Sequence, residues 1–257
     1  MDDFGLVLRQ WRQTRGYSQL DLGLAADVSA KHVSFLETGR AKPSREMVAL
    51  LASTLDIPLS ERNMLLQAAG FREGYSCMTL DQAEMEPVRR ALDYTLENHN
   101  PYPAIVMDQD WNMLMVNEGY QKLLTRVISL RPNMPQTQNV LELFFDPDGV
   151  RPLVQNWEDI AALLLQRVHR ERVLYKHGSS ELLDKLLAYP NIPNDWKEID
   201  FSRSALPMAS VIFQLEDISL ELFSSLSMFG TAIDVNMQKL VIEQYFPVDE
   251  HTAKFFS

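Results

Sequence analysis

The amino-acid sequence predicts an α+β chain: an all-helical N-terminal domain over residues 1–72, then a domain built on an antiparallel sheet with helices. Two observations support this prediction. Up to residue 72, apolar side chains recur at helical spacing, and cap residues separate five helical segments. After residue 103, short apolar runs typical of strands stand on either side of two helical patterns. Residues 73–86 lack such periodicity, so we expect a linker there and a second domain over 87–257.

The first two helices are predicted from their apolar positions and their start signals. Leu8 lies on the inner face of the first helix. Ser18 is a good N-cap for the second helix, and Asp21 stands where a capping box places an acid. Leu20 and Leu24 are expected to supply the apolar stripe of this helix.

The third helix follows a short turn, is capped by Ser29 and turns Val33 inward. A helix, a tight turn and a second helix make the helix-turn-helix plan, which places the second of the pair in the major groove of DNA. The fourth helix is predicted to start at Ser44. The fifth is predicted to run from a cap at about Ser60 to Gly70.

The window around these two helices resembles the Xre/Cro family of helix-turn-helix domains. The resemblance covers about residues 5–71 and implies binding to double-stranded operator DNA. We expect the protein to bind this DNA as a homodimer. Two recognition helices would then enter the major groove about 10 base pairs apart. The matching residues are Ser18, Gln19, Ala26, Val28, Ser29, Val33, Ser34, Glu37, Gly39, Arg40, Pro43 and Ser44.

Residues that contact DNA are predicted from their place on this motif. Gln19, at the start of the second helix, is expected near a phosphate. Exposed positions at the start of the third helix should meet base edges or phosphates. The basic loop after it, including Arg45, should clamp phosphates, and Arg12 and Arg15 are expected to do the same. Glu37 is expected to be structural and to pair with a nearby arginine. The candidate DNA-binding residues are Gln19, Ser29, Lys31, His32, Ser34, Arg40 and Lys42.

The charge distribution fits a DNA-binding segment within an acidic chain. The net charge is −11, which by itself argues against a nucleic-acid binder. Residues 9–45, however, hold seven basic and three acidic side chains, and the whole negative balance falls after residue 70. One cysteine excludes an internal disulfide framework. With no signal-peptide pattern and no apolar run long enough for a membrane, we expect a cytoplasmic protein.

The second domain is predicted as a sheet whose strands come at its two ends in sequence. An amphipathic helix precedes the first strand, and Asn117 caps a helix after the second. The last apolar run has the pattern of a strand that is interrupted by a short helix. Strands are predicted at 104–107, 111–116, 208–215, 220–228 and 233–244, and helices at 87–98, 157–176 and 179–189.

This part of the sequence resembles the MmyB-like ligand-binding domain, which follows an Xre-type domain in a family of bacterial transcription regulators. The resemblance implies a PAS-like sensor that holds a small apolar ligand, with a fatty-acid-like molecule as the best-supported type. It rests on Pro103, Asp108, Trp111, Asn117, Asn139, Val140, Leu141, Phe229, Gly230, Thr231 and Asp234.

Methionine-rich strands offer candidate ligand contacts. Alternation along 111–116 predicts that Trp111, Met113 and Met115 share one face. Methionines suit an adaptable binding surface and an irregular packed core equally well, so both interpretations stay open. The candidate ligand-binding residues are Met107, Trp111, Met113, Met115, Leu222 and Met228.

The function that the sequence favours is ligand-responsive, sequence-specific transcription regulation. In one alternative, the regulator is constitutive and its C-terminal domain serves only dimerisation or protein interaction. In another, an enzyme has acquired a DNA-binding domain. No metal-ligand spacing, nucleophile elbow or phosphate-binding loop is present in the sequence, so we expect no enzyme activity, no metal and no cofactor.

Overall fold

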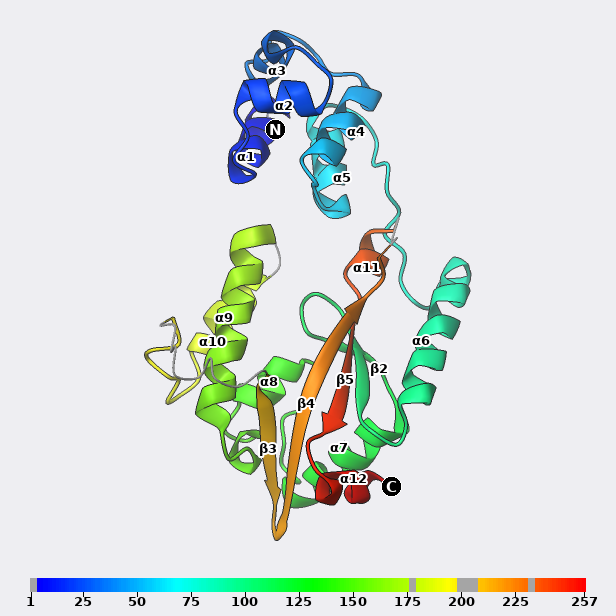
Figure 1. The fold of residues 1–257 in the computed structure, drawn as a ribbon, viewed down its shortest axis with the longest axis vertical. Helices are drawn as coiled ribbons and strands as arrows, with labels where there is room; N and C mark the ends of the chain where they lie inside the picture. The colour runs from blue at the N-terminus through cyan, green and yellow to red at the C-terminus, as the bar shows by residue number, and fades with distance from the viewer. Residues whose placement is uncertain (1–3, 176–178, 198–207, 231–233) are drawn as a thin grey trace. The chain divides into compact units, whose positions relative to one another are not determined.

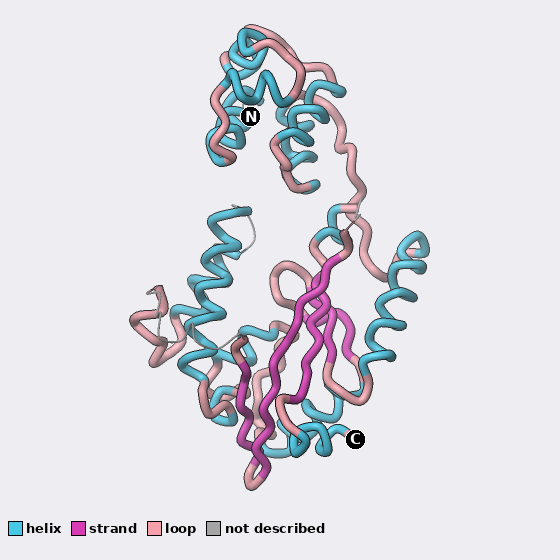
Figure 2. Tube along the Cα trace, viewed as in Figure 1, coloured by secondary structure: helices cyan, strands magenta, loops and turns pink. Residues whose placement is uncertain are grey.

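The computed structural model describes residues 4–175, 179–197, 208–230 and 234–257. These residues form two compact units (Figure 1). Unit 1 comprises Met1–Thr79 and Phe229–Gln238, and unit 2 comprises Leu80–Met228 and Lys239–Ser257. Figure 2 shows helices and loops in unit 1, whereas the strands lie in unit 2.

Unit 1 is a helical domain whose helices start where the sequence places its cap residues. Ser18 and Asp21 form both halves of the capping box, with N–O distances of 3.0 and 2.9 Å. Ser29 and Ser44 cap the next two helices, each accepting a hydrogen bond from the backbone N–H three residues later. The helices of unit 1 are α1 (Phe4–Thr14), α2 (Gln19–Ala25), α3 (Ala30–Glu37), α4 (Arg45–Thr54), α5 (Leu59–Ala68) and α11 (Val235–Gln238).

The inner face of α2 differs from the prediction. Leu20 and Leu24 are 60% and 75% exposed, whereas Leu22 is completely buried. The reason is the close crossing of α2 and α3: a Cβ added to Gly23 would lie 2.7 Å from the carbonyl oxygen of Val28. The face that includes residues 22 and 23 therefore packs against α3, and the predicted stripe points outward.

The start of α5 also differs. The helix begins at Leu59, its N-cap is Pro58, and its cap residue makes no side-chain hydrogen bond. Ser60 lies inside the helix and is not the predicted cap. The first backbone N–H groups of a helix have no partner within it, so α5 needs an acceptor from elsewhere in the chain.

Unit 2 is built on an antiparallel sheet. Within the described residues the sheet has five strands in the order β2-β1-β5-β4-β3, so the first and last strands in sequence meet at its centre. The predicted α+β class is confirmed. The elements of unit 2 are the short 3₁₀ turns Ala83–Met85 and Arg151–Leu153, α6 (Glu86–His99), β1 (Ala104–Met107), β2 (Met113–Val116), α7 (Glu118–Leu130), α8 (Val140–Phe145), α9 (Trp157–Tyr175), α10 (Ser179–Leu187), β3 (Ser210–Leu215), β4 (Ile218–Met228), β5 (Val241–Pro247) and α12 (Glu250–Phe256).

Two predicted strand boundaries need correction. β2 begins at Met113, because residues 108–112 form a turn in which Asp108 Oδ1 accepts hydrogen bonds from the backbone N–H groups of Asp110 and Asn112, both at 2.9 Å. The predicted run 233–244 is divided between helix α11 and strand β5, which continues to Pro247. Residue 233 lies outside the described residues.

One face of the sheet packs against helices and forms the main core of unit 2. Ile105 and Met107 of β1 join side chains from α8, α9 and α10, including Phe145, Leu165 and Leu183. α6 packs separately against β1. The face that includes Ile105 and Met107 is therefore the one on which a ligand enclosed by sheet and helices would lie.

Candidate DNA-binding face and sensor core

The start of α3 is held in place by its cap and by the crossing with α2. Ser29 Oγ accepts a hydrogen bond from the backbone N–H of His32 at 3.1 Å. Lys31 is exposed, and His32 and Ser34 are half-buried. Because exposed positions at this end of a recognition helix meet base edges, the geometry leaves these side chains able to reach DNA.

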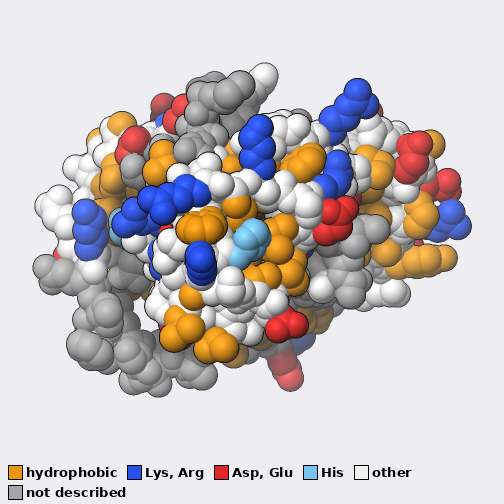
Figure 3. Space-filling view, turned by 90° about the horizontal axis from the view of Figure 1, so that it is seen from above, with side chains coloured by type: hydrophobic (Ala, Val, Ile, Leu, Met, Phe, Trp, Pro, Cys, Tyr) orange, Lys and Arg blue, Asp and Glu red, His pale blue; other side chains and the backbone are white. Residues whose placement is uncertain are grey.

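Basic side chains gather around an aromatic ring on α3. The Lys31 ammonium lies 5.5 Å and the Arg40 guanidinium 6.0 Å from the centre of the Phe35 ring. Arg40 and Lys42 are exposed in the loop after α3. Figure 3 shows Lys and Arg side chains around a histidine on the face seen from above. Phe35, which the sequence analysis did not place in the site, brings two cations together through cation–π contact.

Gln19 lies in a buried polar network. Its side-chain amide donates to Glu37 Oε2 at 2.9 Å. Arg12 donates to both oxygens of Glu37, at 2.5 and 3.1 Å, and also to the backbone carbonyl of Tyr17 at 2.7 Å. The structure thus confirms that Glu37 pairs with an arginine, and it ties Gln19 to the pair rather than leaving its amide free.

In unit 2, the strand register brings several predicted ligand residues into one row. Met107 of β1 pairs with Met113 of β2 and with Val241 of β5, which in turn pairs with Met228 of β4. Neighbouring side chains in such a row stand on the same face of the sheet. Met107 is buried, whereas Met228 is 64% exposed.

The predicted shared face of Met113 and Met115 is wrong. An irregularity in pairing between Val106 and Met107 leaves Leu114 without its own partner, so Met115 pairs with Val106 and Val116 with Ile105. A bulge of this kind shifts later side chains to the other face. Val116 therefore takes the core position expected for Met115.

Trp111 and Leu222 are both buried but belong to different clusters. Trp111, 4% exposed, packs in the core that contains Met107. The guanidinium of Arg167 lies 4.4 Å from the centre of the Trp111 ring and donates to Glu171 Oε1 at 3.0 Å. Leu222, fully buried, packs near α7 and α12 with Leu123 and Phe256.

A buried acid stands in the middle of this apolar face. Glu243 of β5 is 9% exposed and pairs with Ile105 on one side and Leu226 on the other. The pKa of its carboxyl is raised, because the effect of burial exceeds that of the hydrogen bonds from Ser224 and Tyr245, which lower the pKa. Burial, and then the charge of Glu243, likewise raises the pKa of the Tyr245 hydroxyl.

Together with Tyr120, whose pKa is also raised by burial, these residues form what we call the Glu243 cluster: Glu243, Tyr245, Ser224 and Tyr120. Sequence reasoning missed this cluster. The available signal was an acid that directly follows the apolar run Leu240, Val241 and Ile242 in a predicted strand.

The polar residues behind the MmyB-like resemblance hold the framework of unit 2. Asn117, 5% exposed, accepts from the backbone N–H groups of Ala104 and Tyr120 and donates to two carbonyls. Asn139 caps α8 and donates to the carbonyl of Asp110 at 2.7 Å. Thr231 lies outside the described residues.

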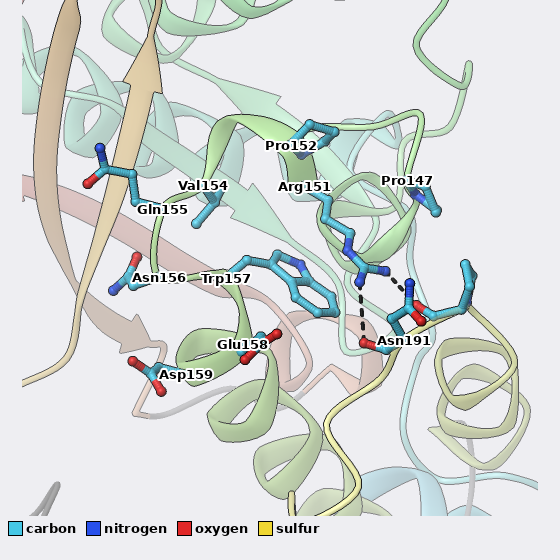
Figure 4. A pocket seen from close by; sticks show the side chains of 11 residues that line it. Pro147, Arg151, Pro152, Val154, Gln155, Asn156, Trp157, Glu158, Asp159 and Asn191 are labelled. Carbon is cyan, nitrogen blue, oxygen red and sulfur yellow. Dashed lines mark hydrogen bonds between the residues drawn. The ribbon is translucent and has the colours of Figure 1, made fainter.

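A pocket of about 540 Å³ lies elsewhere in unit 2, beside Arg151 and Trp157 (Figure 4). The Arg151 guanidinium lies 3.6 Å from the centre of the Trp157 ring and donates to the carbonyls of Pro190 and Asn191, at 2.7 and 3.3 Å. None of the predicted ligand residues lines this pocket, and Glu158 and Asp159 at its edge do not suit an apolar ligand.

The fold of unit 1 and the basic face of α3 are those of a helix-turn-helix DNA-binding domain, and residues 8–62 match the helix-turn-helix family model. The chain is thus a DNA-binding protein whose helix-turn-helix domain is followed by a second unit. Residues 88–257 match the family described as "MmyB-like transcription regulator ligand binding domain". The chain belongs to this family.

Other comparisons add little. No curated protein matches the chain. A solved structure described as "Structure of an RNA-binding Light-Oxygen-Voltage Receptor" aligns with a TM-score of 0.27 and 9% identity, over 97% of this chain and 60% of that chain. A similarity this low carries no conclusion about fold or function.

Among the described residues, no helix is long and apolar enough to cross a membrane. In the same part of the chain, no group of three or more His, Cys, Asp or Glu side chains is arranged to hold a metal ion.

Proposed function

We propose that the protein is a cytoplasmic, sequence-specific regulator without enzyme activity, whose DNA affinity responds to a small apolar molecule bound in unit 2. It acts as a homodimer, with Lys31, His32 and Ser34 of each copy at the DNA and Arg40 and Lys42 on phosphates. The family supports DNA binding and a ligand-binding domain. The arrangement of the sheet supports the kind of ligand.

The observation that carries the ligand proposal is the Glu243 cluster within an apolar face that is incompletely covered. Leu226, opposite Glu243, is 44% exposed, and Tyr120 and Tyr245 keep accessible surface although protein surrounds them. Burying polar groups in an apolar core is costly unless they find hydrogen-bond partners, and in this cluster Ser224 and Tyr245 hydrogen-bond Glu243. An apolar chain with one polar end suits this face, because the chain covers Leu226 and the polar end reaches the cluster.

The first test is native mass spectrometry of the protein purified from cells. A small molecule that is present in the intact complex and released on denaturation supports the proposal and gives the ligand class. A protein without a bound molecule, which also fails to bind added dodecanoic acid or dodecan-1-ol, supports the constitutive regulator instead.

A pair of variants locates the site. Leu226 and Ser225 are neighbours on β4 and stand on opposite faces of the sheet. Leu226→Asp is expected to weaken calorimetric binding of dodecanoic acid and dodecan-1-ol at least tenfold, because it adds a charge to the apolar face. Ser225→Asp is the control and should change binding less than twofold. Equal effects of the two substitutions would contradict this location.

A further inference from the structure

The segment Phe229–Gln238, which we call the connecting segment, joins β4 to β5 but belongs to unit 1. Both strands lie in the interior of the sheet of unit 2. The chain thus leaves the sheet after Met228, forms α11 within unit 1, and returns to begin β5 at Val241 (Figure 1). The two strands are therefore joined through the backbone to a segment of unit 1.

Asp234 anchors the connecting segment. Asp234 is buried, with 4% of the residue exposed. Oδ1 accepts from the backbone N–H groups of Asn236 and Met237, at 2.9 and 3.1 Å, and so caps the start of α11. Oδ2 accepts from the backbone N–H of Met78 at 3.0 Å. One carboxylate therefore fixes both α11 and the chain that follows α5.

Residues 76–78 are bound to the connecting segment by further hydrogen bonds. The backbone N–H of Val235 donates to the carbonyl of Ser76 at 2.8 Å, and the side-chain amide of Asn236 donates to the carbonyl of Met78 at 2.9 Å. Just before this stretch, Asn63 of α5 accepts from the backbone N–H groups of Gly74 and Tyr75, both at 3.0 Å. The hydrogen bonds thus run continuously from the connecting segment to α5.

Gln238 makes a second, direct link. Its side-chain oxygen accepts from the backbone N–H of Leu59 at 3.0 Å. Leu59 is the first residue of α5, and the residue before it, Pro58, supplies no side-chain cap. The first turn of α5 therefore takes an acceptor from a residue 179 positions later in the chain, three positions before the start of β5.

We propose that the connecting segment transmits the state of the sheet to the DNA-binding unit. This inference rests on the proposed function, because it takes the sheet to be the sensing element. Leu226 and Glu243, which pair across β4 and β5, lie a few residues from the two ends of the segment. A ligand that moves these strands displaces Asp234 and Gln238, which frees residues 76–78 and removes the cap of α5. Such a ligand acts only by binding the docked and released states differently.

One substitution releases the segment with little other change. Asp234→Asn keeps a side-chain oxygen that can cap α11. It replaces the oxygen that accepts from the backbone N–H of Met78 with an NH₂ group, which cannot accept this hydrogen bond. The matched control is Asp249→Asn, because Asp249 caps α12 in unit 2 through the backbone N–H of Thr252. In the full chain, amide hydrogen exchange over residues 76–78 should be at least tenfold faster in Asp234→Asn and unchanged in Asp249→Asn. Unchanged exchange in both variants would overturn the assignment of Asp234 as the anchor.

Transmission itself is tested by combining substitutions. Leu226→Trp fills the accessible apolar face, and Ser225→Trp on the opposite face is its control. The readout is the Kd for a duplex that the full-length wild-type protein has selected from a random-sequence pool, measured at one salt concentration. Leu226→Trp is expected to change this Kd at least threefold in the wild-type background and less than 1.5-fold in the Asp234→Asn background. No change in either background, or an equal change in both, overturns the proposal.

This result is separable from the ligand proposal. If no molecule binds unit 2 but the effect of Leu226→Trp still depends on Asp234, transmission stands and the sensing proposal fails. If dodecanoic acid binds but its effect on the Kd is the same in the wild-type and Asp234→Asn proteins, the site stands and transmission fails.

A disulfide provides a second check of transmission: Cys77, the single cysteine of the chain, is joined to a cysteine introduced by Asn236→Cys. The Sγ of Cys77 lies 3.2 Å from Asn236 Oδ1, and oxidation should abolish the effect of Leu226→Trp until the bond is reduced.

Discussion

The buried pair of Arg12 and Glu37 joins α1 to the end of α3, and its removal is the sharpest test of that role. The Arg12 and Glu37 side chains are 10% and 2% exposed and share two hydrogen bonds. Arg12→Met leaves the Glu37 carboxylate buried, with Gln19 as its remaining hydrogen-bond donor among the contacts described here. Breaking a buried pair in this way costs about 3–5 kcal/mol.

Because 1.4 kcal/mol corresponds to a factor of ten, amide hydrogen exchange in α3 and α4 of the full-length Arg12→Met protein should be faster by a factor between about 10² and about 4 × 10³. The double variant Arg12→Met, Glu37→Leu removes both charges and should recover most of this loss, since apolar replacements of buried pairs are often neutral. A loss below about 1 kcal/mol in the single variant, or no recovery in the double variant, would refute the reasoning.

Three further predictions concern the DNA face, the helix crossing and the sensor core. Lys31→Ala should weaken binding to selected DNA and lower the slope of log K against log salt by about 1, whereas Lys254→Ala on α12 should change neither. Gly23→Ala should destabilise unit 1 and weaken DNA binding, because its Cβ would lie 2.7 Å from the backbone oxygen of Val28; unchanged thermal unfolding would contradict this. The raised pKa of Glu243 means that the folded state holds this proton more tightly than the unfolded state, so stability falls as pH rises above the ordinary value of 4.5 and levels off above the folded pKa. The denaturant midpoint should therefore fall less between pH 5 and pH 8 in Glu243→Gln than in the wild-type protein. The same fall in both proteins would refute this prediction.

What the sequence predicts well is local. Ser18, Ser29 and Ser44 each bond a backbone N–H three residues later, so helix starts follow from a few neighbouring residues. Leu20 and Leu24 were misassigned because a helix of only seven residues offers two apolar faces. The choice between them depends on which face α3 approaches, and that is a tertiary contact.

The candidate site was harder to predict for the same reason. Met107 and Met228 belong to one row only because β5, at the end of the chain, enters between β1 and β4. The cap of α5 comes from Gln238, and no local pattern indicates a partner that far away. The reversed positions of Met115 and Val116 depend on a one-residue irregularity in strand pairing, which alternation cannot reveal.

The strength of the contacts indicates which part of unit 1 can respond to a ligand. Leu8, Leu22 and Leu51 are completely buried, and burial of each stabilises the folded unit by about 1.5–3 kcal/mol. The hydrogen bonds of the connecting segment contribute about 0.5–1.5 kcal/mol each, or about 1.5–3 kcal/mol where the Asp234 carboxylate is the acceptor. Coupling energies between ligand sites are typically about 1–3 kcal/mol. Binding in unit 2 is therefore sufficient to break one or two bonds at Asp234 and Gln238 but not to disrupt the core, so a response to ligand should appear as release of α5 and residues 76–78 while the rest of unit 1 stays folded.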